Sequence, residues 1–518
     1  MYHFHARASR HRFGSRPYSQ SGRYLLGIDA GTSSVKSLII DEGGHVLDVA
    51  RSKYGVARAN NLYAEQDINQ IWDSCLETLN ILNKNNPGVM RNVKAVGLSG
   101  QMHGLVMIGE DDLPLRDAII WEDQRSSSQI QKIYDVIGRE KFCELTLNKL
   151  APGYLITSLL WVHDNEPELF AKIKSVMFVK DYIRFKLCGM IATDVTDASG
   201  SPIFETAKRE WAWKFIRDLE LPEEIFPPCF EAYELAGEIT QEAAKLTGLK
   251  AGTPIVFGGG DTLMSAVGTG TGIIKNFWGV NIGTGCQVIC AANQPLYDKE
   301  FRTNTFCYVN SKANNKVERL WMLMGTNLCG GAAMRWLASH LLNNIKFEEL
   351  DRLASSAPAG SDGVIFLPFL SGSRNNADMR GMFAGLSLNH DRSHIARSII
   401  EGVIFSLKDS YNLLKDITGS EPEAIIASGG GAVSELALQL EANILNKPIY
   451  TTCNPEEACV GAALTAAVGA EFYDSFNDIC ASAVKFNNKV IEPDAKLAEF
   501  YQERFAAYKD LLARNFEI

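Results

Sequence analysis

Two copies of one glycine-centred turn, about half a chain apart, constrain this sequence more than any other feature. Residues 27–35 read Gly-Ile-Asp-Ala-Gly-Thr-Ser-Ser-Val, and residues 279–288 read Gly-Val-Asn-Ile-Gly-Thr-Gly-Cys-Gln-Val. The apolar runs around the first copy predict a hairpin, with one strand from residue 24 and a second over residues 37–47. One such turn alone is also typical of an ordinary hairpin, but the second copy indicates two homologous halves.

The chemistry of this turn suits a phosphate. Glycines let the backbone approach closely, while successive N–H groups and hydroxyls donate to the phosphate oxygens. Two such turns, each at the tip of a predicted hairpin and facing each other, would clamp a triphosphate. The predicted ATP contacts at the tips are Gly31, Thr32, Ser33, Gly283, Thr284 and Gly285. The P-loop motif G-x-x-x-x-G-K-[ST] does not occur, which excludes that mode of ATP binding.

The halves differ at the residue two positions before each tip. Asp29 precedes the first tip, and Asn281 holds the equivalent place in the second. Only the carboxylate would help to hold a magnesium ion through water. We therefore predict that the halves have diverged in role, with Asp29 as a catalytic residue and Mg²⁺ as a cofactor beside ATP.

Length and composition predict a two-domain protein. The chain has 518 residues, 46% of them hydrophobic, and single cores stop growing at about 250–300 residues. We expect domains at residues 24–268 and 269–518, with the ligands in the cleft between them. Residues 1–23 carry five arginines and no acidic residue, which is typical of a targeting segment or a disordered extension.

The net charge and the cysteine pattern restrict the classes of partner that the protein can bind. A net charge of -10 argues against nucleic acid and anionic membranes. The 11 cysteines form no C-x-x-C pair, as expected of a reduced cytoplasmic protein, and no apolar run reaches the roughly 18 residues of a membrane span. The partners should be small molecules, and a homodimer is compatible with the sequence.

Two further strands end in polar or acidic turns. Residues 93–100 predict a buried strand that runs into Gln101 and His103, at the end of a strand where α/β sheets bind ligands. Residues 253–260 form an apolar run ending in three glycines before Asp261, and a helix follows. Asp261 would serve there as a helix N-cap or as the base that phosphoryl transfer requires. The histidine at position 103 likewise has two interpretations, as a residue of a β-turn or as a ligand contact.

Another strand, residues 425–428, leads into three consecutive glycines and a predicted helix over residues 435–445. Such a turn lets a ligand approach the backbone, although it also makes a tight strand-to-helix connection. Residues 461–464 supply the small residues of the last predicted helix, which suit close packing.

Together these motifs resemble the carbohydrate kinases related to glycerol kinase, the FGGY type, over nearly the whole chain from about residue 24. The resemblance implies an α/β fold of two duplicated domains of the actin-like, ribonuclease H-like or hexokinase type, with the active site in the cleft between them. It also implies ATP-dependent phosphorylation of a sugar hydroxyl.

The resemblance also implies roles for single residues. The Gly-Gly-Gly-Asp sequence that ends at Asp261 is similar to the one carrying the family's catalytic base. The Ser-Gly-Gln-Met-His-Gly loop resembles that of the xylulokinases, which implies D-xylulose as the substrate and D-xylulose 5-phosphate as the product. The substrate contacts so implied are Gln101, Met102, His103, Asp261 and Thr262, and the adenosine contacts are Gly430, Gly431 and Ser434.

Further segments match the family less decisively. Residues 121–125, Trp-Glu-Asp-Gln-Arg, resemble a motif at the edge of the active site, but a structural ion pair of Asp123 with Arg125 explains them nearly as well. The chain has Thr262 where xylulokinases usually have Asn, and Ser373 where the family generally has Glu. These departures leave open another ketose or polyol, such as ribulose or sedoheptulose, and a non-catalytic ATP-binding regulator of the same fold is the alternative of another class.

Overall fold

The computed structural model describes residues 22–313, 316–373, 376 and 378–516. Residues 1–21, most of the predicted extension, lie outside the described residues, and the first strand begins at Tyr24. No helix in this part of the chain is long and apolar enough to cross a membrane.

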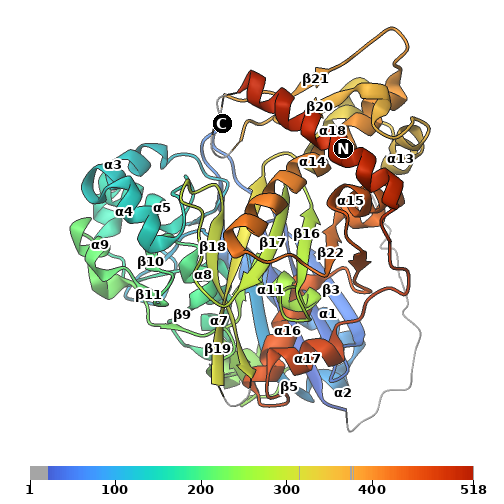
Figure 1. Ribbon diagram of the computed structural model, residues 1–518. Helices are drawn as coiled ribbons and strands as arrows, with labels where there is room; N and C mark the ends of the chain where they lie inside the picture. Colours follow the sequence, from blue (N-terminus) through green and yellow to red (C-terminus); the bar gives the residue numbers. More distant parts are fainter. Residues whose placement is uncertain (1–21, 314–315, 374–375, 377, 517–518) are drawn as a thin grey trace, which may run out of the picture.

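Two β-sheets organise the structure (Figure 1). The first has the order β13-β14-β5-β1-β2-β3, with β15 beside β5, and the second has the order β18-β19-β17-β16-β22-β23. The first-sheet strands are β1 (Tyr24–Ala30), β2 (Ser34–Asp41), β3 (Val46–Lys53), β5 (Val93–Gly100), β13 (Leu235–Glu238), β14 (Pro254–Val256) and β15 (Gly259–Gly260). The second-sheet strands are β16 (Phe277–Ile282), β17 (Cys286–Ala292), β18 (Asn304–Ala313), β19 (Lys316–Asn327), β22 (Ala424–Gly429) and β23 (Ile449–Thr451).

The sheets share one topology. β1 pairs antiparallel with β2, β2 antiparallel with β3, and β1 parallel with β5. In the second sheet β16, β17, β19 and β22 repeat this arrangement in the same directions. The predicted duplication and the actin-like fold class are therefore confirmed.

The predicted second strand was wrong in its bounds. β2 begins at Ser34, directly after the tip, and ends at Asp41. The Asp41 carboxylate accepts hydrogen bonds from the backbone N–H groups of Gly43 and His45, and Gly44 adopts a φ of 80°. This turn divides residues 37–47 between β2 and β3, because an Asp side chain that bonds the backbone two residues ahead favours a turn.

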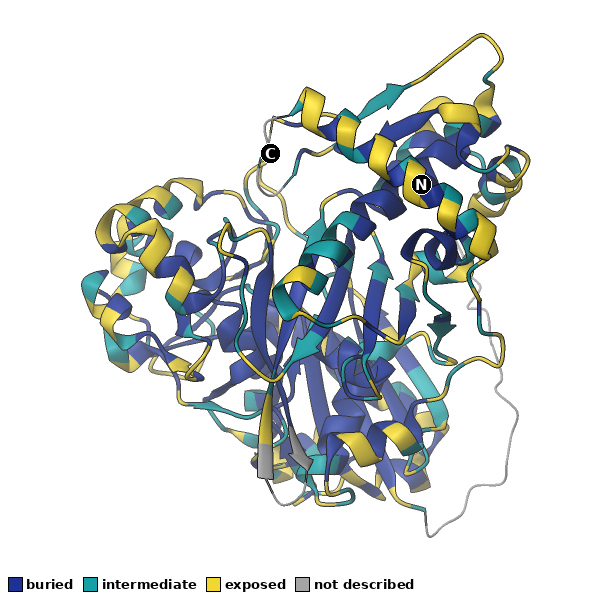
Figure 2. Ribbon diagram, viewed as in Figure 1, coloured by how far each residue is buried: buried dark blue, intermediate teal, exposed yellow. Residues whose placement is uncertain are grey.

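Helices cover both sheets and fill the space between them (Figures 1 and 2). The helices against the outer face of the first sheet are α1 (Ile68–Asn85), α7 (Val179–Cys188) and α10 (Gln241–Thr247). Those against the outer face of the second are α14 (Arg392–Thr418), α15 (Glu435–Leu445) and α18 (Ala495–Asn515). Between the sheets lie α11 (Asp261–Thr269), α16 (Glu457–Gly469) and α17 (Phe476–Ala483).

A separate core holds a helical extension of the first half, at the left of Figure 1. Its helices are α3 (Ser127–Ile137), α4 (Arg139–Thr146), α5 (Leu155–Asn165) and α9 (Trp213–Asp218). The short helix α8 (Val195–Ser199) connects this extension to the sheets. Further elements of the second half are α12 (Gly331–Trp336), α13 (Phe347–Ser355), β20 (Ile365–Leu367) and β21 (Met382–Ala384).

Helix α16 crosses from the second half onto the first sheet. A Cβ atom added to Gly27 of β1 would lie 1.9 Å from the Cys459 carbonyl oxygen, and one added to Gly97 of β5 would lie 1.8 Å from that of Ala462. Gly461 meets α11 in the same way, 1.8 Å from the Met264 oxygen. The small residues at 461–464 thus serve close packing, although α16 is not the last helix.

This contact predicts a large loss of stability for Gly97→Ala. The added methyl group would collide with a backbone carbonyl that cannot rotate away, so β5 and α16 must separate. We expect the free energy of unfolding to fall by about 3 kcal/mol, as for strongly overpacked cores, measured by chemical denaturation. Gly88→Ala is the control, because no atom lies within 4 Å of its added Cβ. Equal stability of the two variants would contradict the packing described here.

Candidate active site

A cleft of about 340 Å³ lies between the two sheets. Both strands that precede the glycine tips reach it, as do the beginnings of α11 and α16. Its polar lining residues include Asp29, Lys36, Asp261, Thr262, Asn281, Gln287, Ser428, Glu456 and Glu457. Sequence segments more than 400 residues apart therefore meet at one site, and three of the predicted residues, Asp29, Asp261 and Thr262, face it together.

The duplication extends to the polar contacts of the cleft. Asp29 lies beside Ser99 of the parallel strand β5, and Asn281 lies beside Ser428 of the parallel strand β22. The Ser99 hydroxyl donates to Asp29 Oδ1 at 2.8 Å, whereas Asn281 Nδ2 donates to the Ser428 hydroxyl at 2.9 Å. The serine reverses its role because a hydroxyl both donates and accepts.

Two carboxylates share the cleft. Burial raises the pKa of Asp261 to about 7, and the negative charge of Asp29 adds to the effect. Burial also raises the pKa of Asp29, although the Ser99 hydrogen bond and the charge of Lys36 oppose this. A carboxylate with a pKa near neutral pH is well matched to accept a proton from a hydroxyl group.

Asp261 is not the N-cap of α11. The cap residue is Gly260, and Asp261 is the first residue of the helix. Its Oδ1 accepts a hydrogen bond from the N–H of the next residue, Thr262, at 2.7 Å, whereas a capping side chain bonds the second or third N–H beyond itself. The capping alternative therefore does not account for this residue.

The loop after β5 is closely held. Gln101 is buried, and its Nε2 donates to Gln66 Oε1 at 2.7 Å, while Gln66 Nε2 donates to the Thr32 carbonyl at 2.7 Å. His103 has a φ of 75°, and its ring stacks on Tyr154 with centroids 4.1 Å apart. The amide of Gln101 thus links the loop to the first tip.

Side chains outside the tips reach both of them. Trp121 Nε1 donates to Thr32 Oγ1 at 3.0 Å, and an Arg335 guanidinium nitrogen donates to Thr284 Oγ1 at 2.9 Å. Lys36 forms an ion pair with Glu456 at 2.5 Å. Lys36 was not predicted as a site residue, although the hairpin places it directly opposite Asp29, and neither was Arg335, for which no motif gave a signal.

The glycines at the end of β22 form a short 3₁₀ turn before α15. A Cβ atom on Gly431 would lie 2.8 Å from the Ile282 Cβ, so packing requires this glycine whatever it binds. Ser434 is the N-cap of α15, and its Oγ accepts from the Ala437 N–H at 3.0 Å.

Ser373 lies in the loop between β20 and β21, where its hydroxyl accepts a hydrogen bond from the Asn376 N–H at 2.9 Å.

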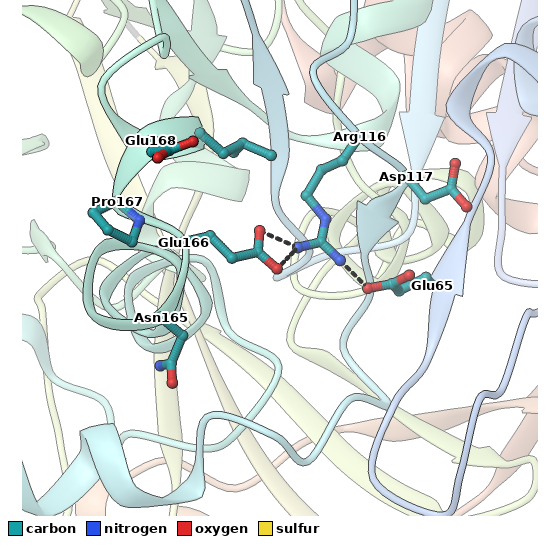
Figure 3. Close-up of a pocket in the computed structure, with 8 residues that line it drawn as sticks. Glu65, Arg116, Asp117, Asn165, Glu166, Pro167 and Glu168 are labelled. Carbon is teal, nitrogen blue, oxygen red and sulfur yellow. Dashed lines mark hydrogen bonds and ion pairs between the residues drawn. The ribbon is translucent and has the colours of Figure 1, made fainter.

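A larger hollow of about 680 Å³ contains none of the predicted site residues (Figure 3). The carboxylates of Glu65 and Glu166 point at the Arg116 guanidinium from two sides. Glu65 also pairs with Arg125 at 2.6 Å, and Arg125 pairs with buried Asp123 at 2.8 Å. The ion pair considered for residues 121–125 is therefore present, and the Arg116 guanidinium of this hollow is bound by the carboxylates of Glu65 and Glu166.

The chemistry of the cleft residues fits magnesium and a triphosphate. Magnesium prefers oxygen ligands and keeps several of its waters in nucleotide sites, which suits the single carboxylate of Asp29 in the first tip's strand. The two glycine tips, with Thr32 and Thr284, follow the strands of Asp29 and Asn281, which line this cleft. The structure thus places these residues between two duplicated actin-like halves.

Comparison with known proteins agrees. Models of the FGGY family of carbohydrate kinases match residues 24–268 as its N-terminal domain and residues 279–470 as its C-terminal domain. Xylulose kinase from Staphylococcus epidermidis is 31% identical over 95% of this chain and 97% of its own length. The chain belongs to the FGGY family of carbohydrate kinases.

Solved structures are similar along almost the whole chain. Gluconate kinase from Lactobacillus acidophilus superposes with a TM-score of 0.86 at 29% identity, covering 95% of this chain and 98% of that one. Ligand-bound xylulose kinase from the same organism gives a TM-score of 0.86 at 28% identity, covering 94% and 97%. The named substrates of these relatives differ although their folds agree.

Proposed function

We propose that this kinase transfers the terminal phosphoryl group of ATP to D-xylulose and forms D-xylulose 5-phosphate. Asp261 takes the proton of the attacking hydroxyl, and Asp29 holds Mg²⁺ through water. Residues 24–268 form the sugar-binding domain and residues 269–518 the nucleotide-binding domain. In this proposal the sugar contacts are Gln101, Met102, His103 and Thr262, and the ATP contacts are the two tips with Gly430, Gly431 and Ser434.

One observation carries the proposal. Asp261 and Asp29 line the same cleft as the second tip's strand, and the loop after β5 packs against Gly260, the residue before Asp261, since a Cβ on Gly260 would lie 2.5 Å from Met102 Cγ. A sugar held by that loop would meet the base at the point where the triphosphate ends. Such positioning, with a base to accept the proton, is what phosphoryl transfer needs from a protein.

The chain's own residues divide the reaction between them. As the sugar oxygen forms its bond to the γ-phosphorus, the bond to the β–γ bridging oxygen breaks and ADP leaves, and the hydroxyl proton passes to the Asp261 carboxylate. The tips hold the phosphates with N–H and hydroxyl donors, which stabilise the charge of the transferring group. Bound magnesium would neutralise part of the phosphate charge.

Substrate assays test the reaction and its specificity together. ADP release is measured with D-xylulose, L-xylulose, ribulose, sedoheptulose, gluconate and glycerol, and the phosphorylated carbon is located by NMR. We expect the highest kcat/KM for D-xylulose, with phosphate on O5. A higher value for another sugar would correct the substrate, and ADP release with none of them would favour the non-catalytic alternative.

His103→Ala separates the sugar site from the nucleotide site. Loss of a hydrogen bond in a buried polar site costs about 1–3 kcal/mol, so we expect the KM for the sugar to rise roughly 5- to 150-fold with little change in the KM for ATP. His163→Ala is the matched control, because this histidine lies near the end of α5, bonds Asp164 and is outside the proposed sugar-binding loop. A raised KM for ATP with an unchanged KM for the sugar would move His103 to the nucleotide site.

A further inference from the structure

A buried cluster of charged side chains lies behind the proposed base. Lys180 of α7 has no exposed side-chain surface, and its Nζ lies 2.7 Å from Asp181, 2.6 Å from Asp194 and 3.2 Å from Asp197. Arg184 pairs with Asp181 at 2.5 Å. Buried ion pairs often stabilise a fold no better than well-packed apolar residues, so stability alone is a weak reason for this cluster.

The cluster reaches the base through Thr196. The Thr196 hydroxyl donates to Asp194 Oδ1 at 2.5 Å and accepts from the Gly260 N–H at 3.0 Å. A hydroxyl has one proton to donate, so its bond to Asp194 turns its lone pairs towards Gly260. Gly260 is the N-cap of α11 and directly precedes Asp261.

Helix α8 and the residue that follows it, Gly200, also hold the loop after β5, which carries His103. His103 Nδ1 lies 2.6 Å from the Gly200 carbonyl oxygen, at the end of α8. A Cβ atom on Gly260 would lie 2.8 Å from Met102 Sδ and 3.1 Å from Asp197 Oδ1. The loop, the turn that carries the base and α8 are therefore packed without space to shift independently.

We propose that Thr196 is a positioning residue for Asp261, and that the Lys180–Asp194 ion pair fixes the direction of its hydroxyl. Through Gly200, the same helix sets the loop of His103, so α8 aligns the sugar with its base. The proposal rests on the assignment of Asp261 as the base. Misplacing a reacting group by about 1 Å can lower the rate on the order of a hundredfold, so a residue that fixes the position of the base can have a large effect on kcat.

Thr196→Val tests the proposal, because valine keeps the shape of threonine and removes its hydroxyl. We expect kcat to fall about 10- to 100-fold with little change in the KM for ATP, and Thr196→Ser to restore most of the activity. The buried Thr247 hydroxyl, at the end of α10, likewise donates one hydrogen bond, in this case to the Ala243 carbonyl, and accepts one, from the Leu249 N–H, so Thr247→Val is the control. It should lose comparable stability in thermal unfolding and keep its kcat.

The outcomes separate this proposal from the proposed function. A wild-type protein that phosphorylates none of the tested sugars would remove the base assignment itself. With an active wild type, a folded Thr196→Val variant of normal kcat, or a serine variant as impaired as the valine one, would overturn the positioning role. Thr196→Ala provides the same comparison with serine if the valine variant does not fold, because alanine also lacks the hydroxyl and adds no bulk.

Discussion

Replacing Asp261 with Asn is expected to lower kcat by roughly 10²–10⁴-fold, the usual worth of general-base help, while both substrates still bind. The amide keeps the size of the carboxylate and its ability to accept from the Thr262 N–H, but it takes up no proton. Steady-state kinetics with D-xylulose measures the effect, and Asp218→Asn, at the end of α9 and outside the cleft lining, is the control. Near-normal activity of a folded Asp261→Asn protein would require another base.

The pH dependence gives this prediction a second readout. Because the pKa of Asp261 is about 7, kcat/KM of the wild type should fall about tenfold per pH unit below that value as the base becomes protonated. The residual rate of the Asn variant should lack this limb. A wild-type profile that stays flat from pH 7 to pH 5 would contradict the assignment.

As the pH rises, the stability of the wild-type protein should fall while its activity rises. The folded-state pKa of Asp261 is raised from an ordinary value of 3.8 to about 7, so the folded protein binds the proton more tightly and loses stability as the pH rises through this window. The Asn variant avoids that loss. We therefore expect a higher melting temperature than wild type at pH 8 and no difference near pH 4.

Replacing Asp29 with Asn is expected to weaken the apparent affinity for magnesium by roughly 10–100-fold, as for residues that hold a metal indirectly. The fold should tolerate the change, because the second half already contains an asparagine at this place, paired with Ser428. Ser99 only has to accept a hydrogen bond instead of donating one.

Magnesium titration at fixed ATP measures this effect. The KM for the sugar should stay close to wild type, since Asp29 lies in the strand before the phosphate tip and not in the loop after β5. Asp41→Asn, at the end of β2 and outside the cleft lining, is the control. An unchanged magnesium requirement in Asp29→Asn would remove the metal role.

Local sequence patterns predicted the elements whose signals are contained within one segment. The apolar run of residues 93–100 is β5, and the helix expected at residues 435–445 is α15. The repeated turn predicted the duplicated topology of the sheets. The second strand was misplaced because the turn at residues 42–45 depends on hydrogen bonds of Asp41, which an apolar pattern does not show.

Features that depend on distant parts of the chain could not be predicted in this way. Thr196 looks like an ordinary residue of a capped turn until Gly260, 64 positions away, is seen to donate to it. Arg335 reaches Thr284 only because the backbone of residues 330–332 bonds to the second tip. In both cases the partner is brought by tertiary structure, and neither residue belongs to a local motif.

The crossing of α16 has a consequence for biosynthesis. When residues 24–268 have left the ribosome, one face of their sheet still lacks the helix whose backbone touches Gly27 and Gly97. That face is apolar and stays uncovered until α16 has been synthesised as far as residue 469. The nascent amino-terminal half therefore exposes a hydrophobic surface of the kind that chaperones recognise. The two halves, although alike in topology, should therefore acquire their native structure together and not one after the other.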